Sequence, residues 1–460
     1  MSFPAALARE LESLLGRERF RTDPADRAVY AYDNSRRRGQ AGAVAFPLNE
    51  AEVADIVRAC NTHRWPLIAR GLGSNTVGAT VPENDALVVS LERMNKIEAV
   101  DKANRYVIAE AGATNAAIQE AARKAGFFWP PDPTSAAYST LGGNLACNAA
   151  GPHAVKYATP RENILGLTAV TGTGEIIRVG TRTTKGVVGY DFTRLLLGSE
   201  GTLAIITRAT LKLWPLPEAV ATLRACYANV DAAAGAVSRI MAQPDLPWVL
   251  EFMDAEAVGL IRNRGVELPE GTESLLLLEV EASRDGLEGA VKRLGETVKG
   301  EGLVAFEAAK DKEEAALLWQ ARKALSPSLR TLRAGKINED VVVPVAEIPA
   351  LVARLGELAE AADIPIVSFG HAGNGNLHVN LLFDPDDERE TRAAKDTLPQ
   401  VFKAVLELGG TLSGEHGVGT AKRDYVELEL GPEVLQLMRE VKRVFDPNGI
   451  LNPGKTLPPS

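Results

Sequence analysis

The sequence predicts an α+β fold built from two main parts, and three observations support this. Up to about residue 217, short apolar runs alternate with helical stretches, and glycines stand at the ends of the apolar runs. Pro215 and Pro217 then mark a boundary. Beyond them, strand-like and helical runs alternate, which predicts an antiparallel sheet with helices on one face. We expect domains at 1–217 and 218–422, followed by a segment at 423–460 that returns to the first domain.

The elements of the second part follow from its apolar runs and helical periodicity. Its expected strands lie near 222–227, 249–252, 275–280, 303–307, 340–343 and 366–368. Its expected helices cover 231–241, 313–325 and 346–361. A chain of 460 residues is long enough for two to three domains, each with its own core.

Composition excludes several classes of protein. Hydrophobic residues make up 45% and charged residues 24%, which is ordinary for a globular protein. The net charge of -9 argues against a nucleic-acid partner, so we interpret Arg36, Arg37 and Arg38 as a solvated loop. Three cysteines provide neither a disulfide framework nor a zinc knuckle. The chain has no signal-peptide pattern and no transmembrane segment. We expect a cytoplasmic protein, with peripheral attachment at the inner membrane face left open.

A glycine-rich loop follows the apolar run at 66–69. It reads Arg70-Gly71-Leu72-Gly73-Ser74-Asn75, in which the two glycines let backbone N–H groups converge. Such a loop suits a pyrophosphate, although a plain glycine-rich turn is about as common. The loop is no P-loop, because no Gly-Lys-Ser/Thr follows it, and Thr76 stands where the dinucleotide fingerprint needs a third glycine.

The segment at 130–151, PPDPTSAAYSTLGGNLACNAAG, joins a proline-rich turn to a run of small side chains. Small residues such as Gly142 let a large flat ligand lie close to the backbone. Thr134, Asn144 and Asn148 offer hydrogen bonds without charge. The alternative is a small-residue helix packed tightly against a sheet.

Three of the five histidines lie in two short motifs, FGHAGNGNLHVN at 369–380 and SGEHGVG at 413–419. Period-2 alternation places His378 and Asn380 on one face of a strand. His371, His378 and Glu415 form a typical open metal set of two imidazoles and one carboxylate. The alternative is a hairpin in which backbone carbonyls satisfy the histidines.

Together these stretches resemble a known family, the FAD-dependent oxidoreductases with the vanillyl-alcohol oxidase or p-cresol methylhydroxylase (PCMH) type of FAD domain. The chain is most similar to the branch with D-lactate dehydrogenases, D-2-hydroxyglutarate dehydrogenases and the flavin subunit of glycolate oxidase. The resemblance rests on PLIARGLGSN, PPDPTSAAYSTLGGNLACNAAG, YATPRENILGLTAVTGTGEII, LLLGSEGTLAIITRATLKL and ILNPGK. It implies a two-part PCMH-type FAD domain followed by a substrate (cap) domain.

The resemblance also implies a cofactor site. The loop lacks the histidine that carries covalent flavin in some relatives, so we expect non-covalent FAD. The implied cofactor-binding residues are Arg70, Gly71, Gly73, Ser74, Asn75, Pro131, Thr134, Gly142, Asn144, Asn148, Gly151, Glu200, Gly201 and Asn452.

For the chemistry, the resemblance implies a divalent metal, which is usually zinc in this branch, bound by His371, His378 and Glu415. A metal that chelates the substrate lowers the pKa of its hydroxyl group. His416 would then take the hydroxyl proton as general base, while the Cα hydride passes to FAD N5 and leaves a 2-keto acid. By the same resemblance Asn380, Arg322 and Lys336 contact the substrate, and Arg322 suits its carboxylate.

Other functions remain in competition with this one. They are a redox-neutral FAD transferase similar to alkylglycerone-phosphate synthase, a zinc hydrolase, and a binding protein with a structural metal. For the dehydrogenase we expect a small 2-hydroxy acid as substrate and a quinone, an electron-transfer flavoprotein or a cytochrome as electron acceptor. A homodimer is compatible with the sequence.

Overall fold

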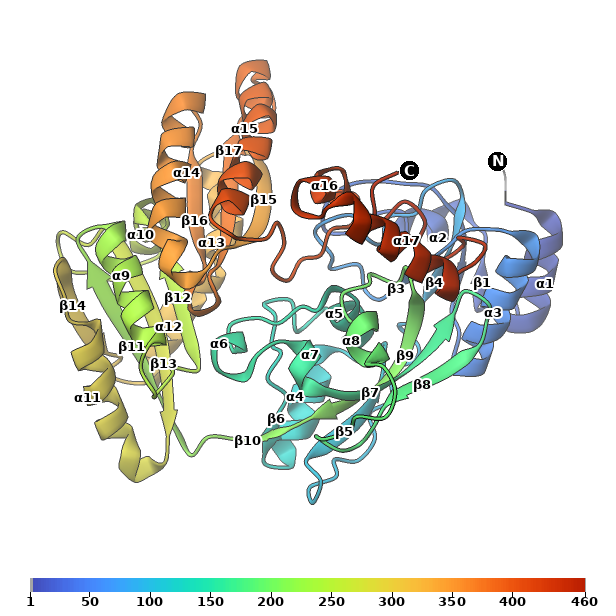
Figure 1. Cartoon of the computed structure of the whole chain (residues 1–460), viewed down its shortest axis with the longest axis horizontal. Coiled ribbons are helices and arrows are strands. Elements are labelled where there is room, and N and C mark those ends of the chain that lie inside the picture. Colours follow the sequence, from blue (N-terminus) through green and yellow to red (C-terminus); the bar gives the residue numbers. More distant parts are fainter. Residues whose placement is uncertain (1–2, 460) are drawn as a thin grey trace. The chain divides into compact units, whose positions relative to one another are not determined.

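The computed structural model describes residues 3–459, which form two compact units (Figure 1). Unit 1 consists of Met1–Ala150, Ala158–Leu216 and Glu415–Ser460, and unit 2 of Gly151–Tyr157 and Pro217–Gly414. Each unit has its own sheets and core. No helix among residues 3–459 combines the length and the apolarity that a membrane crossing requires.

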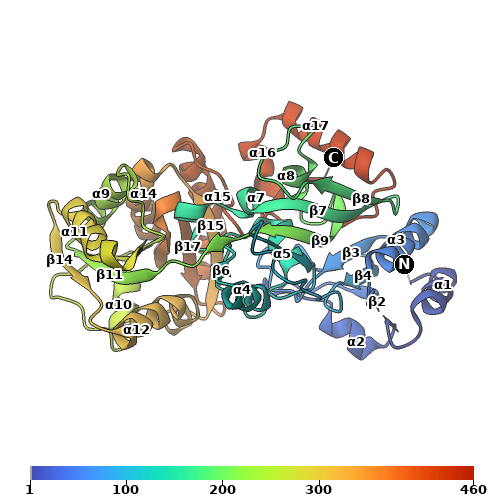
Figure 2. The same ribbon diagram turned by 90° about the horizontal axis from the view of Figure 1, so that it is seen from below.

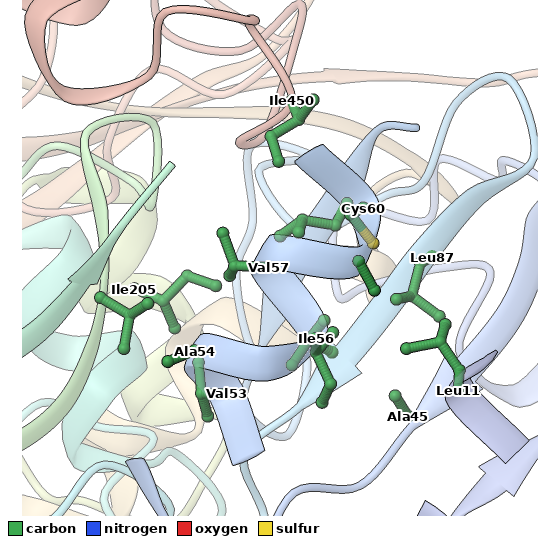
Figure 3. Packing of buried hydrophobic residues seen from close by; sticks show 14 of the residues in the cluster. Leu11, Ala45, Val53, Ala54, Ile56, Val57, Cys60, Leu87, Ile205 and Ile450 are labelled. Carbon is green, nitrogen blue, oxygen red and sulfur yellow. The ribbon is translucent and has the colours of Figure 1, made fainter. Parts of the chain in front are cut away.

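The first sheet of unit 1 has the order β1-β2-β4-β3. Its strands are β1 (Phe20–Arg21), β2 (Ala41–Ala45), β3 (Leu67–Arg70) and β4 (Ala86–Ser90). The strands β2, β4 and β3 are parallel, and they are apolar almost throughout because both of their faces are covered. Two helices, α1 (Ala5–Leu15) and α3 (Glu50–His63), contribute Leu11, Ile56 and Val57 to the core beneath this sheet (Figure 3).

The second sheet of unit 1 is antiparallel, with the order β5-β9-β7-β8. Its strands are β5 (Tyr106–Glu110), β7 (Ile164–Thr171), β8 (Ile176–Gly180) and β9 (Ala204–Lys212). A short pair, β6 (Phe127–Phe128) and β10 (Trp214–Pro215), lies outside it. The core of this part includes the fully buried Trp129 and side chains of α4 (Asn115–Lys124) and α5 (Leu141–Cys147). The remaining helices of unit 1 are α2 (Pro24–Val29), α7 (Pro160–Asn163), α8 (Phe192–Leu196), α16 (Val426–Glu429) and α17 (Pro432–Phe445).

Unit 2 is built on a seven-stranded antiparallel sheet of order β14-β11-β13-β12-β16-β17-β15. Its strands are β11 (Ala219–Tyr227), β12 (Val249–Met253), β13 (Ser274–Ala282), β14 (Leu303–Ala308), β15 (Gly335–Val342), β16 (Ile366–His371) and β17 (Asn376–Phe383). The predicted strands of this part are confirmed, and so is the antiparallel arrangement.

Helices cover both faces of this sheet, whereas the sequence predicted helices on one face (Figure 2). Every residue from Leu275 to Leu278 of β13 is buried, so both faces must be shielded from water. Leu275 and Leu277 pack with α10 (Ala255–Arg262) and α12 (Lys312–Lys323), whereas α9 (Val230–Met241) and α11 (Leu287–Val298) lie on the other side. The other helices of unit 2 are α6 (Ala154–Tyr157), α13 (Leu325–Ser328), α14 (Ile348–Ala362) and α15 (Glu388–Glu407).

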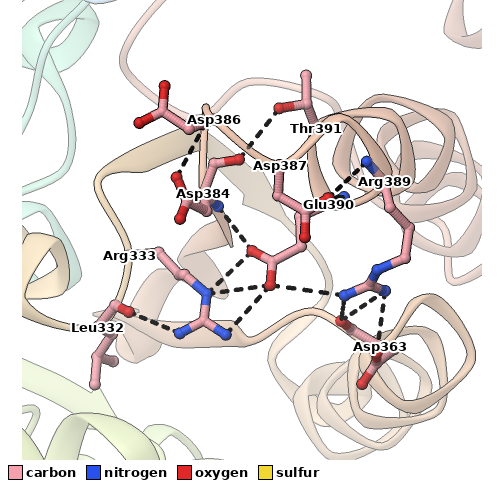
Figure 4. A network of polar contacts seen from close by, with 9 residues as sticks. All are labelled: Leu332, Arg333, Asp363, Asp384, Asp386, Asp387, Arg389, Glu390 and Thr391. Atoms are coloured by element: carbon pink, nitrogen blue, oxygen red, sulfur yellow. Dashed lines mark hydrogen bonds and ion pairs between the residues drawn. The ribbon is translucent and has the colours of Figure 1, made fainter.

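A polar network fixes the ends of β15 and β17 (Figure 4). The Nε of Arg333, just before β15, donates to the Glu390 carboxylate over 3.0 Å. The same carboxylate accepts the Asp384 N–H, just after β17, over 2.7 Å. One side chain at the start of α15 therefore ties together two neighbouring strand ends and supports the register on which His378 and Asn380 depend.

Candidate functional site

The glycine-rich loop in unit 1 follows β3, as predicted, but its long polar side chains turn inward. Arg70 is buried, and its Nη1 donates to the Tyr32 carbonyl over 2.7 Å. A Cβ atom at Gly73, which has φ +71°, would overlap this guanidinium, so the loop closes directly over it. Burial lowers the pKa of Arg70. The side chain therefore supports the loop from beneath.

Asn75 joins the loop to its neighbours. Its Oδ1 accepts the N–H groups of Val77 and Ala79 over 2.9 and 3.0 Å. Its Nδ2 donates to the His416 carbonyl over 3.2 Å. The structure thus brings the glycine loop against the SGEHGVG motif, although 341 positions separate the two residues in sequence.

The segment at 130–150 contains a turn and the short helix α5. The Pro131 carbonyl accepts the Nδ2 of Asn115, a buried residue that the sequence analysis did not single out. A Cβ atom at Gly142 would lie 2.8 Å from the Cβ of Ala111, so close packing requires the glycine. Asn148, with φ 55°, ends the helix, and Thr134 in the preceding turn is exposed. Gly151 belongs to unit 2.

Several buried polar atoms around these motifs have no hydrogen-bond partner within residues 3–459. They are Arg70 Nε, Thr76 Oγ1, Ser139 Oγ, Asn144 Nδ2 and Asn452 Oδ1. Buried polar atoms almost always have a partner, and an unsatisfied one costs about 1–3 kcal/mol. These atoms belong to the motifs assigned to the cofactor or lie next to them, so they fit a ligand that carries its own donors and acceptors.

The Glu200-Gly201 turn lies in the same unit. Glu200 has φ 52° and is 4% exposed, and its backbone N–H donates to the Ala146 carbonyl of α5 over 2.8 Å. Its carboxylate accepts two backbone N–H groups, from Val418 over 2.7 Å and from Gly419 over 2.8 Å. Burial raises the pKa of Glu200 to about 7.

In unit 2, His371 and His378 lie on neighbouring antiparallel strands. His371 is the last residue of β16, and His378 lies on β17 opposite Phe369. Their ring centroids are 5.3 Å apart, with the ring planes at 82°. The predicted approach of these two imidazoles is therefore present in the structure.

Glu251 on β12 is the site residue that the sequence analysis missed. It is 1% exposed, and its carboxylate contacts both the His371 Nδ1 and the Arg322 guanidinium. Burial alone would raise the pKa of Glu251, but Arg322 and His371 outweigh this effect and lower it to about 2. An ionised carboxylate only accepts hydrogen bonds, so the Nδ1 of His371 carries a proton in this contact.

The three residues predicted to contact the substrate also lie in unit 2. Arg322 directs Nε and Nη2 to Glu251, with 2.7 Å from Nε, and stacks on Phe369 at 4.8 Å. Asn380 is buried, and its Nδ2 donates to the carbonyls of Val367 and His378 over 3.1 and 2.9 Å. Its Oδ1 has no partner within residues 3–459. The Nζ of Lys336 donates to the Ser326 hydroxyl over 2.9 Å.

Glu415, the third predicted metal ligand, follows Gly414 in the chain. The N–H of Gly414 donates to the carbonyl and to the carboxylate of Asp340 over 2.8 and 3.0 Å. Asp340 is the cross-strand partner of His378. Glu415 follows Gly414 directly, and the boundary between the two units falls between these two residues. His371, His378 and Glu415 each offer one atom of a type that binds metals.

Two families of known proteins match most of the chain. Residues 41–180 match an FAD binding domain, and residues 216–456 match the C-terminal domain of FAD linked oxidases. The chain is 38% identical to the glycolate oxidase subunit GlcD of Bacillus subtilis, over 97% of this chain and 95% of that protein. It is 36% identical to a D-lactate dehydrogenase of Anaerostipes hadrus, over 88% and 87%. It is 32% identical to a D-2-hydroxyglutarate dehydrogenase of Stutzerimonas stutzeri, over 98% of each chain.

Solved structures share the fold. A p-cresol methylhydroxylase with bound substrate has a TM-score of 0.78 at 17% identity, covering 98% of this chain and 96% of that one. An alkyldihydroxyacetonephosphate synthase has a TM-score of 0.76 at 21% identity, covering 98% and 86%. At these identities the likeness establishes the PCMH-type fold alone, and it gives the redox-neutral transferase no advantage over the dehydrogenase.

Proposed function

Since the chain belongs to the family of FAD-linked oxidases, we propose that it oxidises a small D-2-hydroxy acid to the 2-keto acid. The substrate is of the D-lactate, D-2-hydroxyglutarate or glycolate type, as the names of its relatives indicate. This proposal rests on a chain of contacts: Glu251 binds both Arg322 and His371, and the ring of His371 lies beside that of His378. This arrangement presents one oriented imidazole and one guanidinium side by side, as a chelated hydroxy acid requires.

FAD would be held non-covalently in unit 1, over the Arg70–Asn75 loop and against α5. The buried groups of Thr76, Ser139 and Asn144 would then gain partners. Bound FAD would supply the acceptor for the hydride that leaves the substrate Cα. Phosphates suit the backbone of the loop, because the Arg70 guanidinium beneath it adds a positive charge without occupying its surface.

His371, His378 and Glu415 would hold a divalent metal, with zinc as the first choice for two imidazoles and a carboxylate. The metal would supply a Lewis acid that lowers the pKa of the substrate hydroxyl. Glu251 orients His371 for this task, in the way that carboxylates support metal-binding histidines.

Side chains of the protein would bind the substrate and remove its hydroxyl proton. Arg322 has Nη1 left to bind the substrate carboxylate, because Nε and Nη2 are taken by Glu251. Asn380, whose Oδ1 has no partner within residues 3–459, would contact the substrate. His416 takes the hydroxyl proton. The substrate thus loses one hydride and one proton, and its C–O single bond becomes a carbonyl.

A panel of D- and L-2-hydroxy acids, mixed anaerobically with the flavin-loaded protein, tests the proposal. We expect D-2-hydroxy acids or glycolate to bleach the flavin absorbance, and a chelator to abolish the bleaching. If no hydroxy acid bleaches the metal-loaded protein, the proposed oxidation is wrong. If bleaching survives complete metal removal, the metal has no role in it. Turnover with a quinone, an electron-transfer flavoprotein or a cytochrome then identifies the acceptor.

A further inference from the structure

The loop at 416–421 carries the proposed base, His416, and is anchored from two sides within unit 1. On one side, Asn75 Nδ2 donates to the His416 carbonyl over 3.2 Å. The Val77 carbonyl of the same glycine-loop region accepts the N–H groups of Thr420 and Ala421 over 2.9 and 3.1 Å. These contacts hold both ends of the loop.

Glu200 anchors the middle of the loop. Each of its carboxylate oxygens accepts a different N–H group, Oε1 from Val418 and Oε2 from Gly419. A Cβ atom at Gly417 would lie 2.9 Å from Oε1, so the glycine next to His416 is packed directly on the carboxylate. One side chain thus holds the peptide group that joins Gly417 to Val418 and the one that joins Val418 to Gly419.

This position requires a group with two acceptors. A glutamine of the same shape would offer one acceptor and one NH2 group, and that NH2 group would face an N–H donor. The groups that face the Glu200 carboxylate are the Val418 and Gly419 N–H groups, the Thr456 hydroxyl and the Lys422 ammonium, and each favours its ionised form. These groups offset part of the cost of burying the charge, and all of them belong to the loop or the C-terminal segment.

We propose that Glu200 is a positioning residue that sets the orientation of His416 by holding the backbone of residues 417–419. This inference rests on the proposed role of His416. It also assigns a different use to the Glu200 carboxylate than flavin binding, because both of its oxygens are already bound to loop amides.

Glu200→Gln tests the anchor directly through amide hydrogen exchange, which needs no substrate. Glutamine keeps one acceptor, so one of the hydrogen bonds to Val418 and Gly419 is lost and the other loses its charge. We therefore expect exchange at these amides to become about 10–100-fold faster. Glu110→Gln is the matched control. Glu110 is also a buried carboxylate of unit 1, but it accepts the Lys96 N–H and has no contact with the loop in the described hydrogen bonds. Unchanged exchange at both amides in Glu200→Gln would overturn the proposal.

Flavin reduction by a hydroxy acid supplies the second readout, in Glu200→Gln, His416→Ala and the double variant. Misplacement of a catalytic group by about 1 Å can cost on the order of 100-fold, so we expect Glu200→Gln to slow reduction about 10–100-fold, with flavin retained. In the His416→Ala background the same change should have no further effect, since Glu200 acts through His416.

The outcomes separate the two proposals. A slow His416→Ala variant with a fast Glu200→Gln variant overturns the anchor alone. A fast His416→Ala variant overturns the base, and with it the anchor. If the double variant loses as much as the two single variants combined, Glu200 has another role. Flavin release from Glu200→Gln would lead to the same conclusion. Should Glu200→Gln fail to fold, Asn75→Ala, which releases the His416 carbonyl, is measured in the same cycle, and additivity there overturns the two-sided anchoring.

Discussion

Two buried glutamates, one in each unit, are held in opposite ways. Glu251 of unit 2 lies between a guanidinium and an imidazole, which lower its pKa to about 2 against the effect of burial. Glu200 of unit 1 is held chiefly by backbone N–H groups, and burial raises its pKa to about 7. Both are at most 4% exposed, so the difference comes from their partners: dipoles offset the cost of burial only partly, whereas neighbouring cations reverse it.

The same contrast runs through the two regions. The proposed cofactor cradle of unit 1 consists of peptide groups, amides and hydroxyls, with its one arginine turned beneath the loop. The cluster in unit 2 consists of ionisable side chains on adjacent strands. The first composition suits a large ligand with many polar atoms, and the second suits a small charged substrate and a metal.

Among the variants that compare the two regions, His378→Ala should have the largest effect. Removal of one ligand from the proposed metal site should lower the rate of flavin reduction by about 100-fold or more. Flavin should stay bound, because its proposed contacts lie in unit 1. Stopped-flow absorbance and the flavin-to-protein ratio measure both effects. His63→Ala, at a surface histidine of α3 paired with Glu10, is the control. Flavin loss from His378→Ala would contradict the separation of the two regions.

Glu251→Gln tests the charged support of His371. Loss of a supporting carboxylate typically weakens metal affinity by about 10–100-fold, and we expect that range here. Competition against a chromophoric chelator measures it. Glu279→Gln on β13 is the control, since Glu279 accepts from Trp248 and Trp319 instead of a histidine. Equal affinities in the two variants would show that Glu251 does not orient a metal ligand.

Gly71→Ala tests the cradle. A Cβ atom there would overlap the hydroxyl of Thr140, the residue that caps α5. Overpacking of this kind costs about 1–3 kcal/mol, so flavin affinity should fall about tenfold or more while metal affinity stays the same. Gly259→Ala, in α10, meets no atom within 4 Å and should leave flavin affinity unchanged. Flavin titration after deflavination gives both values.

Asp254 shows whether the pKa of a buried carboxylate depends on its partners or on the unit in which it lies. It gives the smallest expected effect. It lies in unit 2 but accepts only backbone N–H groups, from Ala257 over 2.9 Å and from Ser368, and burial raises its pKa to about 7. Its folded pKa lies above the unfolded value, so the folded state binds more protons between about pH 4 and 7. The free energy of unfolding should therefore fall as pH rises through this window.

Asp254→Asn keeps the helix cap and removes the titration. We expect the pH slope of unfolding, measured with denaturant at several pH values, to become less negative by at most ~1.4 kcal/mol per pH unit. An unaltered slope would mean that partner type does not set the pKa of this carboxylate. Glu200→Gln should reduce the slope in the same direction.

The sequence predicted local features well. Glycine loops, strand runs and the period-2 placement of His378 depend on neighbouring residues, and all of them are present in the structure. The sequence could not predict Glu251. Its place beside His371 depends on the pairing of β12 with β16, where Phe252 faces Gly370 across more than a hundred positions. Its one local signal was a single charge within the apolar strand VLEFM.

The contacts of Arg70 and Asn75 with distant segments of unit 1 were not predicted. The resemblance implied that both residues bind the cofactor, and this stays a prediction. In the structure they satisfy backbone groups of distant segments, Tyr32 and His416, which no local pattern reveals. Helices on the second face of the unit 2 sheet were missed for a related reason. The run of leucines in β13 is compatible with a strand buried on both faces, and it is also compatible with a strand buried on one face whose apolar and polar residues do not alternate strictly.

The division of unit 1 into three chain segments has a consequence for biosynthesis. Residues Glu415–Ser460 complete this unit, and Leu451 pairs with Leu67 of β3. On the ribosome, all of unit 2 emerges before residues 415–460, so its sheet can form while the first 150 residues still lack their final partner. Nascent chains that stop before residue 415 would therefore carry a finished second unit and an unfinished first one, with the loop that bears His416 not yet made.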